Sequence, residues 1–290
     1  MANNIELAQK FVPVIDEIYK KGSLTAVLDA TVKPDFSGAG TVKVMKVSTT
    51  GLGDYSRENG YAKGNATVEW EDLKLTEDRS AELNVDRMDD EETLGQAFGM
   101  VMNEFVRTNV VPEVDAFRFA KYATGAGTTV AADLTTGAEV LAAIDTASAE
   151  LDANEVSEDR ILFVSTALKP LLMGAITREW GSDGAVSRIL NGYNDMKIVY
   201  VPAGRFYTGV TLNSGADAWG FAKGSGAKGI NFLMVAKSAV MQATKMALPK
   251  VFNPDENQEK DAWKFQYRLY HDALVYENKA KGVYVHTATT

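Results

Sequence analysis

The chain has 290 residues, of which 46% are apolar and 24% charged, and its formal net charge is −9. This is an ordinary globular composition, the length predicts about two domains, and we do not expect a disordered chain. Because it contains no cysteine, disulfide bonds, thiolate catalysis and cysteine-ligated metals are excluded. The negative charge argues against a surface that coats nucleic acid, since affinity for phosphate comes from clustered Lys and Arg. No stretch approaches the ~20 apolar residues of a membrane span and no signal peptide is visible, so we expect a soluble cytoplasmic protein.

The first segment, Asn4 to Lys20, is rich in apolar residues and is interrupted by Pro13, which prevents one regular helix. A segment this short has too little surface to bury its own apolar side chains, which are Ile5, Leu7, Phe11, Ile15 and Ile18. We expect this arm to lie on another surface, such as that of a second copy.

Two alternating segments, Thr41 to Thr49 and Ala66 to Thr76, predict β-strands. The stretch between them contains four glycines and the turn dipeptide Asn59-Gly60, so we expect one long hairpin with a mobile tip. The alternation predicts apolar residues on one face of the hairpin and charges on the other. Because an isolated hairpin is marginal in water, this pattern favours a partner surface outside its own domain. An ordinary pair of strands in a larger sheet is the alternative.

The longest predicted element is a helix that follows a strand at Arg79 to Asp86. Its apolar face has helical spacing and consists of Leu94, Phe98, Val101, Met102, Phe105 and Val106. Four carboxylates precede it, where the helix dipole favours negative charge: Asp89, Asp90, Glu91 and Glu92. Asp90 or Thr93 is the candidate cap. Pro112 removes a backbone hydrogen bond, so we expect the helix to bend or restart there and to continue to Tyr122, over roughly 45 Å.

The next 120 residues or so predict a compact α/β unit, with apolar strands alternating with helices. The predicted helices are Thr136 to Asn154 and Ala167 to Trp180, and the predicted strands are Arg160 to Thr166, Lys197 to Pro202 and Ile230 to Lys237. We expect a central sheet covered by helices. After it, Trp263 to Tyr276 and Val283 to Val285 predict two closing strands. We expect both to pair with Arg79 to Asp86 beneath the long helix, so that the α/β unit is an insertion.

Three patterns were weighed as chemical sites. Gly224 to Gly229 matches G-x-G-x-x-G, but the dinucleotide fingerprint needs a following helix, whereas here we expect a flexible connection before a strand. The acidic run before the long helix offers oxygen ligands for a cation, but helix-start electrostatics explains it without one. His271 and His286 have no nucleophile-activating set, so we expect exposed or hydrogen-bonded side chains. We predict no catalytic, cofactor-binding or metal-binding residue.

The order of these pieces resembles the Hong Kong 97-type fold of tailed-phage major capsid proteins. The likeness is strongest from Val68 to Phe119 (VEWEDLKLTEDRSAELNVD through VPEVDAFRF) and from Trp263 to His286 (WKFQYRLYHDALVYENKAKGVYVH), which look like capsid proteins of phages infecting Gram-positive bacteria. The resemblance covers essentially the whole chain. It implies an α+β fold with an N-terminal arm at residues 1–35, an extended loop hairpin at 36–78, a peripheral domain with a spine helix at 79–130 and 251–290, and an inserted axial α/β domain at 131–250.

The resemblance also implies a function. The chain would be a non-enzymatic subunit that self-assembles as pentamers and hexamers into an icosahedral shell, located in the virion after assembly in the host cytoplasm. The shell would enclose double-stranded DNA without sequence-specific binding, and the negative charge suits a wall that does not grip phosphate. The implied partners are a portal, a separate scaffolding protein, because the arm begins almost at Met1, and optionally a decoration protein. Some relatives crosslink a loop lysine to an asparagine of the next subunit. Lys63 lies near the hairpin tip, but no partner is identifiable, so we expect noncovalent closure.

Two alternatives remain open from the sequence. An encapsulin-like nanocompartment shell shares the fold and packages enzymes. An α/β enzyme would use the Asp133 to Lys250 lobe as a catalytic domain and form a small oligomer with a ligand pocket. The sequence favours assembly because the arm and the hairpin carry apolar residues that one subunit does not cover.

Overall fold

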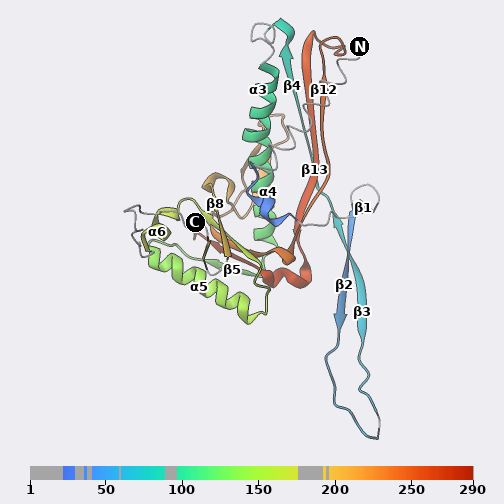
Figure 1. Cartoon of the computed structure of the whole chain (residues 1–290), viewed down its shortest axis with the longest axis vertical. Helices are drawn as coiled ribbons and strands as arrows, with labels where there is room; N and C mark the ends of the chain where they lie inside the picture. Colours follow the sequence, from blue (N-terminus) through green and yellow to red (C-terminus); the bar gives the residue numbers. More distant parts are fainter. Residues whose placement is uncertain are drawn as a thin grey trace, which may run out of the picture.

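The computed structural model describes residues 22–29, 36–37, 41–58, 60–88, 97–175, 192–193 and 196–289. In it a long helix packs beside a sheet of long strands to form an elongated body, and an α/β lobe adjoins one end (Figure 1). A two-stranded hairpin projects from the body next to the lobe. The predicted α+β class is confirmed. Most of the predicted arm, the acidic run Asp89 to Glu92 with its candidate caps, and the end of the predicted helix Ala167 to Trp180 lie outside the described residues.

The elements have the following bounds. The strands are β1 Phe36–Ser37, β2 Thr41–Thr49, β3 Ala66–Lys74, β4 Glu77–Asp86, β5 Thr128–Ala131, β6 Arg160–Ser165, β7 Gly192–Tyr193, β8 Met196–Val201, β9 Val210–Leu212, β10 Phe221–Lys223, β11 Ile230–Ala236, β12 Val240–Phe252, β13 Ala262–Val275 and β14 Val283–Thr287. The helices are α3 Ala97–Phe105, a π-helical turn Val106–Val110, α4 Val111–Thr124, α5 Gly137–Ala153 and α6 Lys169–Ala175, with short 3₁₀ turns at Thr25–Leu28, Ala203–Arg205, Lys237–Ala239 and Glu277–Gly282.

The body contains an antiparallel sheet in the order β12-β13-β4. The predicted pairing of the long closing strand is confirmed, because β13 pairs with β4 in a register that sets Phe265 opposite Leu83. The sequence analysis missed β12, which pairs with β13 along nearly its whole length. Pro249 lies within β12. A strand tolerates proline at a sheet edge, because the missing N–H then faces away from the ladder, and β12 is such an edge.

The long helix of residues 97–124, here called the spine helix, packs on this sheet. Its side chains Met102, Val106 and Val114 are buried against Phe265 and Leu269 of β13. The predicted interruption takes the form of the π-helical turn, after which α4 restarts with proline in its first turn. Because Pro112 has no N–H to donate to the preceding turn, the local bonding pattern changes there. The helix continues to Thr124, two residues beyond the predicted end.

The lobe is built on a mixed six-stranded sheet in the order β5-β14-β11-β6-β8-β7. One face is covered by α5 and α6, as predicted, with Ile144 and Leu172 buried against Leu162. Helix α5 begins with a capping box, in which the Thr136 side chain accepts from the Glu139 N–H and the Glu139 carboxylate accepts from the Thr136 N–H.

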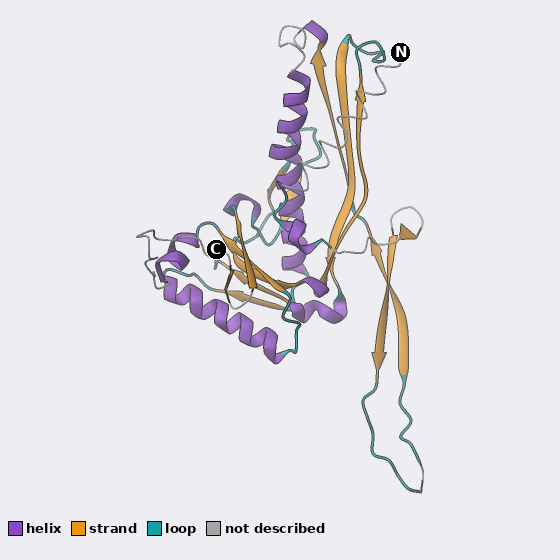
Figure 2. Ribbon diagram, viewed as in Figure 1, coloured by secondary structure: helices purple, strands orange, loops and turns teal. Residues whose placement is uncertain are grey.

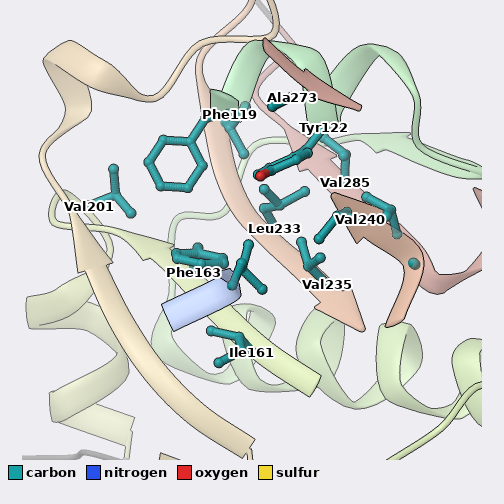
Figure 3. Packing of buried hydrophobic residues seen from close by; sticks show 14 of the residues in the cluster. Phe119, Tyr122, Ile161, Phe163, Val201, Leu233, Val235, Val240, Ala273 and Val285 are labelled. Atoms are coloured by element: carbon teal, nitrogen blue, oxygen red, sulfur yellow. The ribbon is translucent and has the colours of Figure 1, made fainter. Parts of the chain in front are cut away.

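The other face of the lobe sheet is covered by the end of the spine helix. Phe119 and Tyr122 are fully buried there and pack on Phe163 and Leu233 (Figure 3). The ring of Phe119 meets that of Phe163 edge to face at 5.1 Å, a favoured aromatic geometry. One helix therefore contributes to the hydrophobic cores of both the body and the lobe.

The prediction for the last strand was wrong. β14 pairs antiparallel with β11 and parallel with β5 in the lobe sheet, whereas only β13 joins β4. The physical reason is burial on both faces. All five residues of β14 are buried, and Tyr284 packs under α5 while Val285 packs on the opposite face. A strand that is apolar on both faces belongs in a sheet covered on both sides.

Candidate assembly surfaces

The hairpin of β2 and β3 is attached to the body at its root. On the face that we call inward, Val42 is buried against Met241 and Ala243 of β12, and Val44 packs beside them. Further along the same face, Lys46 Nζ lies 2.8 Å from Glu277 Oε2. These contacts fix the direction in which the hairpin leaves the body, away from the first residues of the spine helix (Figure 2).

The charges at this attachment influence one another. The hydrogen bond from Lys46 to Glu277 raises the pKa of Lys46 and lowers the pKa of Glu277. Partial burial, followed by the charge of Glu277, raises the pKa of Glu71. The ion pair is therefore the favoured state at neutral pH.

The opposite, outward face of the hairpin is apolar and exposed. Met45 stands opposite Trp70, and Val47 stands opposite Val68. These side chains are exposed by 56%, 61%, 49% and 57% respectively. Because cross-strand partners share a face, the four form one patch, here called the outward patch. The predicted division into an apolar and a charged face was wrong: Val42 and Val44 lie on the face opposite Trp70, so each face is apolar over a different part of its length.

The tip of the hairpin also exposes apolar side chains. Leu52 is fully exposed, and Tyr55 and Tyr61 meet edge to face at 5.2 Å. Ser56 and Gly60 exchange two backbone hydrogen bonds that close the turn, where Gly60 has a φ of +77°. That left-handed conformation favours glycine. Lys63 lies near this tip, as predicted, and its side chain is exposed. Noncovalent closure stays a prediction.

Residues 22–29, the described remainder of the arm, are held on the spine helix by a buried carboxylate. Asp115 accepts hydrogen bonds from the side chains of Ser23 and Thr25 at 2.8 Å each, and from the backbone N–H of Leu24 at 3.0 Å. Arg118 donates to Thr25 Oγ1 at 2.9 Å. The side chain of Asp115 has no solvent exposure, so these donors replace water around a buried charge. Residues 22–29 are therefore anchored to the spine helix.

Arg79 of β4 links three elements on the other side of the helix. Its guanidinium donates to both carboxylate oxygens of Glu113 on α4, at 2.6 and 3.2 Å, and to the carbonyl oxygen of Asn213 at 2.8 Å. Asn213 begins the loop between β9 and β10, and its side chain donates to the carbonyl oxygen of Trp219. The Trp219 side chain is 74% exposed. Arg79 thus holds a loop with an exposed indole against the body.

The face of the body sheet that points away from the spine helix is charged and internally paired. Arg268 donates to both oxygens of Asp78, and Lys264 lies 3.3 Å from Glu82. The hydrogen bonds from Arg268 lower the pKa of Asp78. Among the described residues of this otherwise charged face, Leu248 is a large apolar side chain that is 48% exposed.

The glycine-rich segment and the two histidines that were weighed as chemical sites lie within the described residues. Gly224 to Gly229 joins β10 to β11, so the predicted connection leading into a strand is confirmed. Nδ1 of His286 accepts from the Asn231 Nδ2 amide at 3.1 Å, and the imidazole ring stacks on Phe232. His271 is 1% exposed, so an exposed side chain was wrong for it, and its Nδ1 has no hydrogen-bond partner among the described residues.

Burial, with the charges of Arg118 and Arg79, lowers the pKa of His271 to about 3. The imidazole is therefore neutral inside the protein. The alternation of β13 is the signal that could have found it, because His271 continues the series Phe265, Tyr267 and Leu269 on the face that packs on the spine helix. Across the described ranges, no group of three or more His, Asp or Glu side chains is arranged to hold a metal, and no helix is both long and apolar enough to span a bilayer.

Comparison with known proteins shows which fold this is. The chain superposes on the capsid structure of cyanophage P-SCSP1u with a TM-score of 0.65 and 14% identity, covering 90% of this chain and 87% of the other. A structure from Microbacterium phage Oxtober96 matches with a TM-score of 0.63 and 14% identity, covering 92% and 91%. The chain has the fold of a phage capsid subunit.

The capsid fold spans nearly the whole of the chains compared. A crystal structure of a virus-like particle from Pyrococcus furiosus matches with a TM-score of 0.58 and 10% identity, covering 96% of this chain and 98% of the other. No family model and no curated protein sequence matches. At identities this low, the likeness lies in the fold, which agrees with the resemblance drawn from the order of the elements.

Proposed function

We propose that this chain is the major capsid protein of a tailed phage and self-assembles, as pentamers and hexamers, into an icosahedral shell around double-stranded DNA. The observation that carries the proposal is the hairpin. Its inward face is fixed to the body, and its outward patch is held away from every described part of the same chain. An exposed apolar ribbon of this kind needs a partner surface, and a shell supplies one for each copy.

We divide the subunit, in line with the resemblance, into an arm at residues 1–35, an extended loop at 36–78, a peripheral domain at 79–130 and 251–290, and an axial domain at 131–250. The strand pairing supports two exceptions. β12 pairs with β13 and is better assigned to the peripheral domain, and β14 pairs with β11 and is better assigned to the axial domain.

The proposal includes a non-enzymatic role, with the extended loop lying across a neighbouring copy and the subunit residing in the virion after assembly in the host cytoplasm. The proposed partners are a separate scaffolding protein, a portal and optionally a decoration protein. The net charge of −9 supports a wall that encloses DNA without gripping it, because such a surface releases few counterions on contact with phosphate.

Electron microscopy of the expressed protein, alone and with a candidate scaffolding protein, tests the proposal. We expect capsomers, tubes or closed shells, with closed shells increasing in number when the scaffold is present. A small soluble oligomer under both conditions would contradict the proposal and favour the α/β enzyme.

A second candidate is a nanocompartment shell that encloses enzymes. A virus-like particle from Pyrococcus furiosus has the same fold over 96% of this chain, so a shell that is not named as a phage capsid is the second candidate. The contents of shells purified from the native source distinguish the two: nuclease-protected double-stranded DNA supports the phage capsid, whereas a stoichiometric enzyme and no protected DNA supports the nanocompartment.

A further inference from the structure

The lobe sends one segment, residues 203–223, out of its sheet and across the spine helix. We call this segment the clasp. It follows β8 and contains the 3₁₀ turn Ala203–Arg205 and the strands β9 and β10, which pair with each other and not with the six-stranded sheet. Both the turn and β9 contact α4. The clasp therefore adds no strand to the lobe sheet, and its packing is directed at the helix.

The first part of the clasp holds one side of the spine helix. The ring of Phe206 is buried and meets that of Phe119 edge to face at 5.1 Å. The guanidinium of Arg205 lies 3.6 Å from the carboxylate of Asp115. Phe119 and Asp115 are four positions apart, so they share a face of the helix. This side is fixed by an aromatic contact inside the lobe core and by an ion pair.

The second part of the clasp is held on the other side of the helix by Arg79 of β4. The guanidinium donates to both carboxylate oxygens of Glu113, at 2.6 and 3.2 Å, and to the carbonyl oxygen of Asn213 at 2.8 Å. Each residue of a helix turns the chain by about 100°, so Glu113 and Asp115 point in nearly opposite directions. The clasp is therefore fixed to the spine helix on two sides.

The loop that Arg79 holds is stiffened by its own hydrogen bonds. Asn213 donates from its backbone N–H to the carbonyl oxygen of Gly220 at 2.9 Å, and from its side chain to that of Trp219 at 3.1 Å. Gly215 has a φ of +86°, and a Cβ there would lie 3.2 Å from the Trp219 ring, so the indole rests against the turn. Because the loop is bonded internally, fixing the carbonyl group of Asn213 fixes the whole loop.

We propose that Arg79 is a positioning residue that sets the angle between the lobe and the body, and that this angle sets the curvature of the shell. The inference rests on the proposed function, because curvature is a property of the assembled shell. Arg79 belongs to the body sheet, Glu113 to the spine helix and Asn213 to the lobe, so one guanidinium joins all three parts. Its two parallel hydrogen bonds to one carboxylate fix direction as well as distance. The pair is also shielded from water, since the two side chains are 25% and 14% exposed.

The angle is important because a shell repeats it in every copy. Hydrophobic packing of Phe119 in the lobe core is non-directional, whereas the hydrogen bonds of Arg79 are directional. A small rotation of the lobe in one subunit would be repeated in its neighbours, and contacts between copies that no longer close produce open arrays. Loss of the Arg79 bonds should therefore change the diameter and closure of the particles.

The variant Arg79→Ala has a matched control in Arg268→Ala. Arg268 also donates to both oxygens of a carboxylate, that of Asp78, but this pair joins β13 to β4 within the body sheet. Hydrogen–deuterium exchange of the unassembled subunit is the first measurement. The amides of the clasp should exchange about tenfold faster in Arg79→Ala than in the parent, because the loop loses its charge-assisted bonds, and at the parent rate in Arg268→Ala.

Electron microscopy of particles assembled under identical conditions is the second measurement. Arg79→Ala should give a broader range of diameters and open tubes, whereas Arg268→Ala should give the diameters of the parent. Arg79→Lys keeps the charge and loses the bidentate geometry, so its diameters should lie between those of the parent and of Arg79→Ala.

The inference is overturned by clasp amides that exchange at the parent rate in Arg79→Ala, or equally fast in both alanine variants. It is also overturned by Arg79→Ala particles that keep the parent diameter at a lower yield, because a merely structural role lowers yield alone. If Arg79→Ala forms no particles, Glu113→Gln takes its place, since the amide keeps the shape and removes the charge, and parent diameters for this variant count against the inference.

Failure of the unmodified chain to form particles contradicts the proposed function, and with it the effect on curvature. The exchange measurement on the subunit decides separately whether Arg79 fixes the clasp.

Discussion

Thr25 is bound to Asp115 of the spine helix twice, through its hydroxyl at 2.8 Å and its backbone N–H at 3.3 Å. The same carboxylate lies 3.6 Å from Arg205 of the lobe. One buried charge thus joins the arm, the spine helix and the lobe, so its loss should affect all three.

Asp115→Asn should destabilise the unassembled subunit by about 3 kcal/mol, because an amide replaces a charged acceptor with one that offers a single oxygen. Urea denaturation measures the change, and limited proteolysis should cut the arm earlier than in the parent. Asp217→Asn, at an exposed loop position, is the control and should change neither. Equal stability of the two variants would show that the Asp115 anchor contributes nothing.

His271 should make the subunit less stable in acid. Its pKa is about 3 in the folded chain and about 6.5 in an unfolded one. Between these values the unfolded chain binds a proton that the folded chain does not, so stability falls as pH falls, by about 1 kcal/mol per unit. The variant His271→Gln should lose this part of the slope between pH 6.5 and 4. Denaturation curves at several pH values give the slopes, and identical slopes for the two proteins would contradict the assignment.

The ion pair between Lys46 and Glu277 should orient the hairpin more than it adds to the free energy of unfolding. The two side chains are 28% and 67% exposed, and exposed ion pairs contribute little to stability. Reversing one charge, as in Lys46→Glu, sets a carboxylate among Glu69, Glu71 and Glu277 and should lower particle yield with little change in unfolding. The swap Lys46→Glu/Glu277→Lys should restore the yield, as counted by electron microscopy. A swap that assembles no better than the single variant would show that the pair itself is unimportant.

Gly137 and Gly174 should respond in opposite directions to alanine. A Cβ at Gly137 would meet the carbonyl oxygen of Leu171 and lie 2.7 Å from the Cβ of Ala175, whereas a Cβ at Gly174 meets nothing within 4 Å. Gly137→Ala should therefore cost about 1–3 kcal/mol through overpacking of α5 on α6. Gly174→Ala should gain about 0.5 kcal/mol from helix propensity. Thermal or urea unfolding compares the two, and a stabilised Gly137→Ala would refute the close approach.

The sequence by itself determined the local elements whose periodicity is strong. β2, β3, β4, β13 and α5 occur within about two residues of their predicted ends. Alternation and helical spacing report which residues share a face of one element. The order of these elements was also sufficient to indicate the capsid fold.

The tertiary structure decided what depends on partners distant in the chain. Register placed Trp70 opposite Met45 and left the two apolar stretches of the hairpin on opposite faces. An edge position allowed Pro249 in β12, and cover on both faces drew β14 into the lobe sheet. The burial of Asp115 likewise has no local signal, because solvent exclusion is created by other segments. A sequence pattern predicts which residues share one face of an element, whereas the tertiary structure determines which distant segments pack against that face.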